Sequence, residues 1–155
     1  MSDIENISPI DGRYKNLTLE LKSFFSEFAL QKYRIKVEIE YFICLCENFL
    51  KLNLLVLDKQ ELRNIYNKFN YSNSIEIKKI EEKTNHDVKA VEYYIKSLIN
   101  NQTSLEKFIN YKEYIHFALT SQDINSVSYS LMMIDCLDIV LRPTLNKLSN
   151  KIEEI

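Results

Sequence analysis

Apolar residues recur at three- and four-residue spacing along most of the chain, the pattern of amphipathic helices. A first run predicts a helix from residue 17 to about residue 30, and a second run predicts a helix from about 32 to 52. The apolar stripe of the second helix is predicted from residues one turn apart, namely Val37, Tyr41, Leu45 and Phe49.

Polar residues mark the predicted helix boundaries in the middle of the chain. Asp58 is predicted to cap the N-terminus of a helix that continues through Phe69. The polar run 70–74 then predicts a loop, and residues 75–82 predict another helical segment.

Two Thr-x-x-Asp sequences have the spacing of a capping box and predict helix starts. One runs from Thr84 to Asp87 and opens a helix that ends at the polar run 100–102. The other runs from Thr120 to Asp123 and follows a predicted short helix over 111–119.

The last predicted helix spans about 35 residues and reaches Ile155, with Pro143 predicting a kink or a break. A helix roughly 50 Å long cannot bury an apolar stripe against itself. The sequence shows no C-terminal cap, so we expect that this helix packs in an oligomer or that the chain is a piece of a longer protein. The expected stripe comprises Ile124, Val127, Leu131, Ile134, Leu137 and Leu141.

Composition favours an all-α fold. The 155 residues include one Gly and two Pro, whereas hairpins, β-sandwiches and phosphate-binding loops need many turn residues. The single Gly and one of the prolines lie in the segment Ser8 to Tyr14, which predicts a turn inside an irregular N-terminal arm over 1–16.

Charge and hydropathy argue against some function classes. The net charge of −2 provides no basic field for nucleic acid. The first residues are acidic where a secretory signal would be basic. Apolar runs are short or interrupted, as by Asp135 and Asp138, and fall below the ~20 residues of a membrane span. We therefore expect a soluble protein without a nucleic-acid or membrane partner.

The cysteines and histidines do not form a metal-ligand pattern. Cys44, Cys46 and Cys136 are odd in number and lie in apolar surroundings, so we expect buried thiols in a reducing cytosol. The two histidines are isolated, and no His-x-x-x-His spacing occurs. We expect no bound metal.

Both histidines stand near predicted helix starts: His86 lies inside the first capping sequence and His116 lies four residues before the second. Helix N-termini present unpaired N–H groups and bind anions, and a nearby imidazole can donate a hydrogen bond or a proton. The pattern therefore indicates an anionic ligand. The alternative is that the polar residues only cap helices and that both imidazoles are hydrogen-bonded near the core.

Three segments together resemble one enzyme family. They are Ser8 to Tyr14 (SPIDGRY), Thr84 to Tyr94 (TNHDVKAVEYY) and Ile115 to Asn125 (IHFALTSQDIN). In order and spacing they are similar to the N-terminal third of the adenylosuccinate lyases, a family within the fumarase/aspartase superfamily. The last segment is typical of the whole superfamily, whereas the first two point to this family.

The resemblance implies an all-helical homotetramer in which each active site combines three subunits. It implies a cytoplasmic enzyme that eliminates fumarate from adenylosuccinate, giving AMP, and from the succinyl-aminoimidazole carboxamide ribotide of purine biosynthesis, without a cofactor or metal. It also implies an N-terminal helical domain over 1–119 and the beginning of a central helical bundle over 120–155.

By resemblance, substrate-binding roles fall on seven residues and a supporting role falls on His116. Arg13 and Tyr14 would hold the nucleotide phosphate, and Thr120 and Ser121 would bind a carboxylate of the fumarate portion. The substrate pocket would be lined by Asn85, His86 and Asp87.

The chain departs from the family pattern in one respect. The family's general-acid histidine in a Thr-His-Gly-Gln context and its serine base in a Gly-Ser-Ser loop do not occur in these residues. We therefore expect no catalytic acid or base within the chain and no elimination by these residues alone.

Two other functions stay open. One is a non-catalytic helical interaction module, and the other is a superfamily lyase with another substrate such as argininosuccinate. Arg13 and Tyr14 argue against the second alternative, because argininosuccinate has no nucleotide phosphate.

Overall fold

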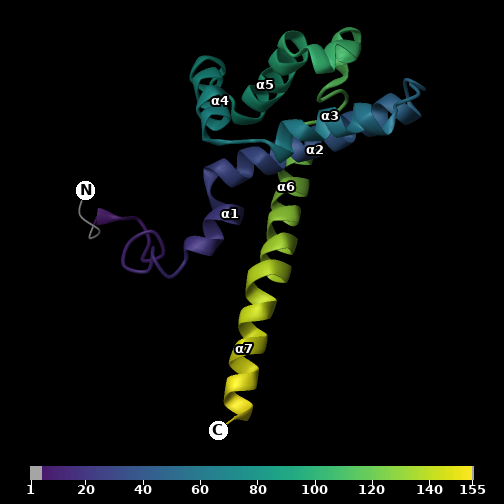
Figure 1. Ribbon diagram of the computed structural model, residues 1–155. Helices are drawn as coiled ribbons and strands as arrows, with labels where there is room; N and C mark the ends of the chain where they lie inside the picture. Colours follow the sequence, from purple (N-terminus) through teal and green to yellow (C-terminus); the bar gives the residue numbers. More distant parts are fainter. Residues whose placement is uncertain (1–4, 155) are drawn as a thin grey trace.

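The computed structural model describes residues 5–154, and all regular elements in this part of the chain are helical (Figure 1). The all-α prediction is therefore confirmed. The elements are the 3₁₀ turn η2 (Leu19–Leu21), α1 (Lys22–Phe25), α2 (Glu27–Asn48), α3 (Val56–Asn67), α4 (Tyr71–Thr84), α5 (Asp87–Asn101), the 3₁₀ segment η3 (Thr103–Tyr114), α6 (Ser121–Cys136), the π-helical segment η4 (Leu137–Leu141) and α7 (Arg142–Glu153).

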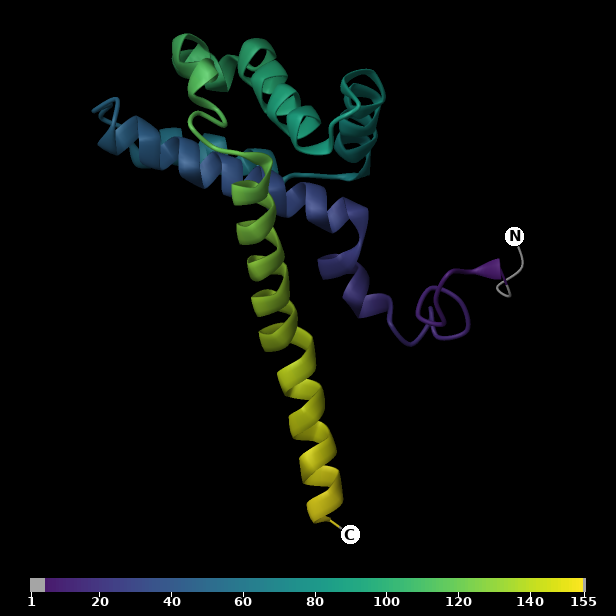
Figure 2. The ribbon, with the colours of Figure 1, turned by 180° about the vertical axis from the view of Figure 1, so that it is seen from behind.

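Helix α2 is the centre of the fold and contacts α1, α3, α4, α5 and α6. Helices α3, α4 and α5 with η3 form a helical head around it, and α6, η4 and α7 form a long stalk that leaves the head (Figures 1 and 2). The hydrophobic core lies inside the head. Its largest fully buried members include Ile35, Ile39, Phe42, Leu62, Ile77, Tyr94, Ile95, Ile99, Leu105, Phe108 and Ile115.

The boundary between the first two predicted helices is wrong. The break occurs at Ser26, whose extended backbone and side-chain oxygen cap α2 by accepting the N–H of Ala29 at 3.2 Å. The predicted apolar stripe also lies on the wrong face of α2. Phe49 is 61% exposed, whereas Ile35 and Ile39 are fully buried. Helix α2 is apolar on more than one face, so spacing alone did not select the core face.

The starts of α3 and α4 also differ from the sequence prediction. Leu55, not Asp58, occupies the N-cap position of α3, and Asp58 lies three residues later, where its carboxylate accepts the Leu55 N–H at 2.8 Å. The predicted loop at 70–74 is instead the first turn of α4. The Asn70 side chain accepts the N–H groups of Ser72 and Asn73, so the polar run is a capped helix start.

The C-terminal helix continues through Pro143 without a break. The π-helical η4 precedes the proline, and Pro143 occupies the first turn of α7, where its missing N–H removes little from the hydrogen-bond pattern. A π-helical segment is one of the known causes of helix irregularity. The predicted disturbance near Pro143 thus takes the form of a π-helical segment, and the predicted break does not occur.

The stalk leaves much of its apolar surface exposed in this chain. Of the predicted stripe, Ile124 is buried against the head, whereas Val127, Ile134, Leu137 and Leu141 are 39–52% exposed. By length and composition alone, the helix Ser121–Glu153 could cross a membrane: its most apolar 18 residues have a mean hydropathy of 1.4 and are 22% buried. The helix itself was predicted, but Asp135 and Asp138 interrupt its apolar runs and hide its high mean hydropathy.

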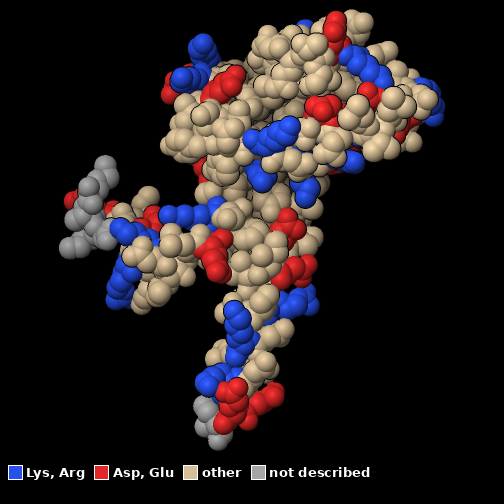
Figure 3. All heavy atoms as spheres, viewed as in Figure 1, with Lys and Arg blue, Asp and Glu red and all other residues tan. Residues whose placement is uncertain are grey.

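The surface carries both charge signs in close mixture. On the face in Figure 3, basic and acidic side chains alternate over the head, the stalk and the N-terminal arm. This distribution agrees with the net charge of −2.

Candidate functional site

The first part of the candidate site is the tight turn between α4 and α5. Asn85 has left-handed backbone angles (φ 50°) and ends α4, and His86 is extended and caps α5. The Nδ1 atom of His86 accepts the N–H of Lys89 at 3.2 Å. The helix start was predicted correctly, but its cap was assigned to Thr84, which is the last residue of α4.

The second part is the start of α6. Thr120 caps this helix, and the Asp123 carboxylate accepts both the Thr120 N–H at 2.7 Å and the Thr120 hydroxyl at 2.8 Å. These two bonds hold the pKa of Asp123 below its ordinary value. The predicted capping box is therefore confirmed. The predicted helix over 111–119 is wrong at its end, because η3 stops at Tyr114 and both His116 and Ala118 have positive φ.

The structure brings these two helix starts together. The Oγ atom of Ser121 lies 3.4 Å from Nε2 of His86, although 35 residues separate them in sequence. The first turns of α5 and α6 therefore lie side by side, and each leaves backbone N–H groups without a partner inside its helix. Such a pair of positive helix ends suits a ligand with carboxylates or phosphates.

A buried arginine that sequence reasoning missed ties the two helix starts to α2. Arg34 is 5% exposed and donates to the Asp87 carboxylate at 2.6 Å and to the side-chain oxygen of Asn125 at 2.9 Å. Burial raises the pKa of Asp87, but the Val88 N–H and the positive charge of Arg34 outweigh it and hold that pKa below its ordinary value. Asp87 is thus an ionised anchor of α5 as well as a candidate pocket residue.

A second buried charged residue on α2 holds the turn that precedes α6. The Glu38 side chain is fully buried, and its Oε1 lies 2.5 Å from Nδ1 of His116. Burial raises the pKa of Glu38, opposed by the hydrogen bond and charge of His116. Arg34 and Glu38 are one turn apart. Charged residues one turn apart are usually a solvent-exposed pair on a helix surface, so the local sequence carries no signal of their burial.

Arg13 and Tyr14 lie apart from this junction. The arm that carries them projects from α1 away from the head in both views (Figures 1 and 2). The Arg13 guanidinium donates to the Tyr14 hydroxyl at 2.7 Å and lies 4.6 Å from the centre of its ring. Within this one chain, therefore, the arm does not join the other predicted site residues.

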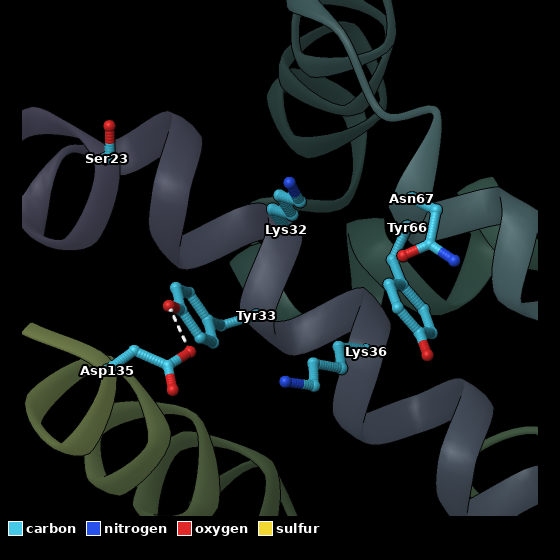
Figure 4. A pocket seen from close by; sticks show the side chains of 7 residues that line it. All are labelled: Ser23, Lys32, Tyr33, Lys36, Tyr66, Asn67 and Asp135. Carbon is cyan, nitrogen blue, oxygen red and sulfur yellow. Dashed lines mark hydrogen bonds between the residues drawn. The ribbon is translucent and has the colours of Figure 1, made fainter. Parts of the chain in front are cut away.

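A separate polar pocket of about 210 Å³ lies where α1, α2 and the end of α3 approach α6 (Figure 4). The hydroxyl of Tyr33 donates to Asp135 at 2.7 Å across this pocket, and burial followed by this bond raises the pKa of Tyr33. Lys32 and Lys36 also line it, and their ammonium groups point in different directions in Figure 4. The pocket contains none of the predicted site residues, and its tyrosine contact fastens α6 to α2.

The cysteines and the possible metal ligands are the remaining side chains with reactive or coordinating groups. Cys46 and Cys136 are buried as predicted, whereas Cys44 is exposed, which corrects that prediction for one thiol. Burial raises the pKa of Cys46 to about 11, so its thiol stays protonated and unreactive at neutral pH. In residues 5–154 no group of three His, Cys, Asp or Glu side chains has a geometry that could hold a metal ion.

Comparison with known proteins gives a consistent result. A family model described as lyase matches residues 12–155. Similar curated proteins include the adenylosuccinate lyases of Dictyostelium discoideum (42% identity over 95% of this chain), Buchnera aphidicola from Schizaphis graminum (39% over 97%) and Legionella pneumophila strain Corby (41% over 98%). The matches cover 32%, 33% and 33% of those three proteins, so the chain spans about a third of their length.

Proposed function

The chain belongs to the lyase family, and from that membership we propose that it contributes the substrate-binding part of an adenylosuccinate lyase active site. The proposed reaction releases fumarate from adenylosuccinate, giving AMP, and from the succinyl-aminoimidazole carboxamide ribotide. Its substrates are therefore small nucleotides that carry a phosphate and two carboxylates. No organic cofactor or metal takes part in the proposed elimination.

The observation that supports this proposal is the meeting of two helix N-termini at His86 and Ser121. In the elimination, a base removes a proton from the Cβ atom of the succinyl group, the C–N bond breaks, and an acid protonates the departing nitrogen. Negative charge develops on the carboxylate next to the carbanion. Preorganised N–H groups and a positive helix end stabilise that charge.

Each predicted residue has a place in this proposal. Thr120 and Ser121 bind a fumarate carboxylate, Asn85 and His86 line the pocket, and Asp87 orients the first turn of α5 through Arg34. His116 supports the turn before α6. The general acid and base are contributed from outside residues 1–155.

We propose that the functional unit is a cytoplasmic homotetramer. Residues 1–119 form its N-terminal domain and residues 120–155 begin the central bundle, in which stalks of several copies cover one another. Exposed apolar residues recur along the stalk as a bundle requires: Leu137, Leu141, Leu145, Leu148 and Ile152 are 39–62% exposed. Arg13 and Tyr14 reach the nucleotide phosphate in this assembly, where three subunits complete each site.

The test is a chimera in which this chain replaces the matching N-terminal third of the Legionella pneumophila relative. Light scattering establishes that the chimera assembles to the same size as the unmodified relative. We expect fumarate release from adenylosuccinate and none from argininosuccinate. A chimera of the correct size that releases no fumarate from adenylosuccinate contradicts the proposal, and release from argininosuccinate would favour the other lyase.

A further inference from the structure

We propose that Glu38 is a positioning residue that fixes His116 with its proton on Nδ1, so that the two histidines of the site have opposite tautomers. His86 then presents an Nε2–H donor and His116 presents an Nε2 acceptor. The chemical roles of the two rings rest on the proposed function, whereas the tautomers rest on geometry alone.

The tautomer of His86 follows from its capping role. Its Nδ1 accepts the Lys89 N–H, so the lone pair of Nδ1 is occupied and the ring proton of the neutral imidazole lies on Nε2. That Nε2 faces the Ser121 hydroxyl at 3.4 Å, at the junction of α5 and α6. The side chain of His86 is 48% exposed, so its Nε2–H can also reach a ligand oxygen.

The tautomer of His116 is set by a different partner. Oε1 of Glu38 lies 2.5 Å from Nδ1, inside the core, where the Glu38 side chain is 0% exposed and that of His116 is 16% exposed. A carboxylate that lies against an imidazole nitrogen accepts the ring N–H and thereby fixes the tautomer, so the ring proton lies on Nδ1.

The surrounding charges are compatible with an ionised Glu38. The negative charge of Glu92 on α5 raises the pKa of Glu38, but Glu92 is itself paired with Lys89 at 2.8 Å and Lys96 at 3.0 Å. The ammonium groups of Lys89 and Lys96 balance the negative charge of Glu92. The positive φ of His116 costs conformational energy, and the contact between its Nδ1 and Glu38 helps to hold the residue in that conformation.

The two rings consequently recognise different ligand groups beside the first turn of α6. His86 Nε2 lies next to Ser121 in that turn, and His116 lies four residues before its N-cap residue Thr120. In residues 5–154 the structure gives no hydrogen-bond partner for Nε2 of His116. The donor of His86 suits a carboxylate oxygen, and the acceptor of His116 suits an O–H or N–H group of a nucleotide.

The experiment is a long-range ¹H–¹⁵N NMR correlation of the ¹⁵N-histidine-labelled 155-residue chain. Its two histidines give two ring patterns, which a His116→Gln variant assigns. We expect an unprotonated, pyridine-type Nδ1 for His86 and a protonated, pyrrole-type Nδ1 for His116. A pyridine-type Nδ1 on His116 in the unmodified chain overturns the proposal without any variant.

Variants of Glu38 distinguish a positioning role toward His116 from a packing role in the core. Glu38→Met keeps the side-chain volume but removes the acceptor, and we expect the His116 proton to move to Nε2 while the His86 pattern stays. Glu38→Gln keeps an acceptor oxygen and should restore the Nδ1–H form. As a matched control, Glu40→Met removes an acidic side chain of the same helix that pairs with Arg63, and it should leave both rings unchanged.

An unchanged His116 pattern in Glu38→Met would show that packing alone sets the ring and would overturn the proposal. Should that variant not fold, the unmodified chain and Glu38→Gln still decide the question. Because no substrate is present, failure of the chimera to release fumarate would refute the lyase proposal and leave the tautomer assignment standing.

Discussion

Arg34 and Asp87 form an ion pair of 2.6 Å that fixes the start of α5 against the middle of α2. The side chain of Arg34 is 6% exposed and that of Asp87 is 49% exposed, so the pair lies at the edge of the core. The same guanidinium donates to Asn125 on α6. One side chain thereby aligns both helix starts that meet at His86 and Ser121.

Replacement of Arg34 should loosen this alignment. We expect Arg34→Met to lower the free energy of unfolding by about 2 kcal/mol, because Asp87 and Asn125 lose a buried partner. Arg34→Lys should recover part of that loss, since one ammonium cannot reproduce the planar two-sided contact. Urea denaturation measures both values. Arg142→Met, which breaks an exposed pair with Asp138, should change stability by less than about 0.5 kcal/mol.

The ionised state of Asp87 predicts an acid dependence of stability. The folded pKa is lower than the unfolded value of about 3.9, so the contribution of Asp87 is present above that pH and is lost as pH falls through the lower folded pKa. The urea midpoint of the unmodified chain should therefore fall more steeply below about pH 4 than that of Asp87→Asn. Parallel curves for the two proteins would show that Asp87 does not contribute.

The proposed substrate-binding role of His86 and its role as the N-cap of α5 can be tested separately. Asparagine is among the best helix N-caps, so His86→Asn should keep α5 stable to within about 1 kcal/mol. In the chimera, the same change should lower kcat by about 100-fold or more, because the imidazole is lost from the site. Thermal unfolding and initial-rate kinetics on one preparation provide the comparison. Unaltered turnover would remove His86 from the reaction.

The sequence predicted the features of the fold that depend on local pattern. Helix content, the starts of α5 and α6 and the end of α5 near Gln102 follow from periodicity and capping residues, and the structure has all of them. The break at Ser26 was missed because several serines and polar residues of that region could cap equally well. Only tertiary packing selects among them.

The site was predictable only in part. His86 and Ser121 were identified because each lies in a recognisable motif, but their approach to 3.4 Å depends on how α5 and α6 pack on α2. Arg34 and Glu38 were missed because charged residues on a helix are usually solvent-exposed. Their burial follows from partners 53 and 78 residues away, which local pattern does not contain.

The contact between Tyr33 and Asp135 predicts how firmly α6 is attached to α2. Tyr33→Phe removes the hydroxyl that donates to Asp135, and we expect a loss of ~1 kcal/mol in the free energy of unfolding, since the partly exposed carboxylate can bind water instead. Tyr71→Phe is the matched control, because Tyr71 is 74% exposed. Equal stabilities of the two variants would show that the hydroxyl does not hold the stalk.

The stalk gives a prediction about assembly that is independent of catalysis. Leu148 is 56% exposed on α7, so its replacement removes almost no packing within the chain. In a bundle, the same residue faces a neighbouring copy, and a charge there would be desolvated without a partner. Leu148→Lys should therefore leave the helix content of the monomer unchanged and shift the chimera to smaller species in light scattering. Asn150→Lys places the same charge on the opposite side of α7 and should keep the full-size assembly, whereas equal disruption by both variants would argue that charge itself, and not an apolar interface at Leu148, controls association.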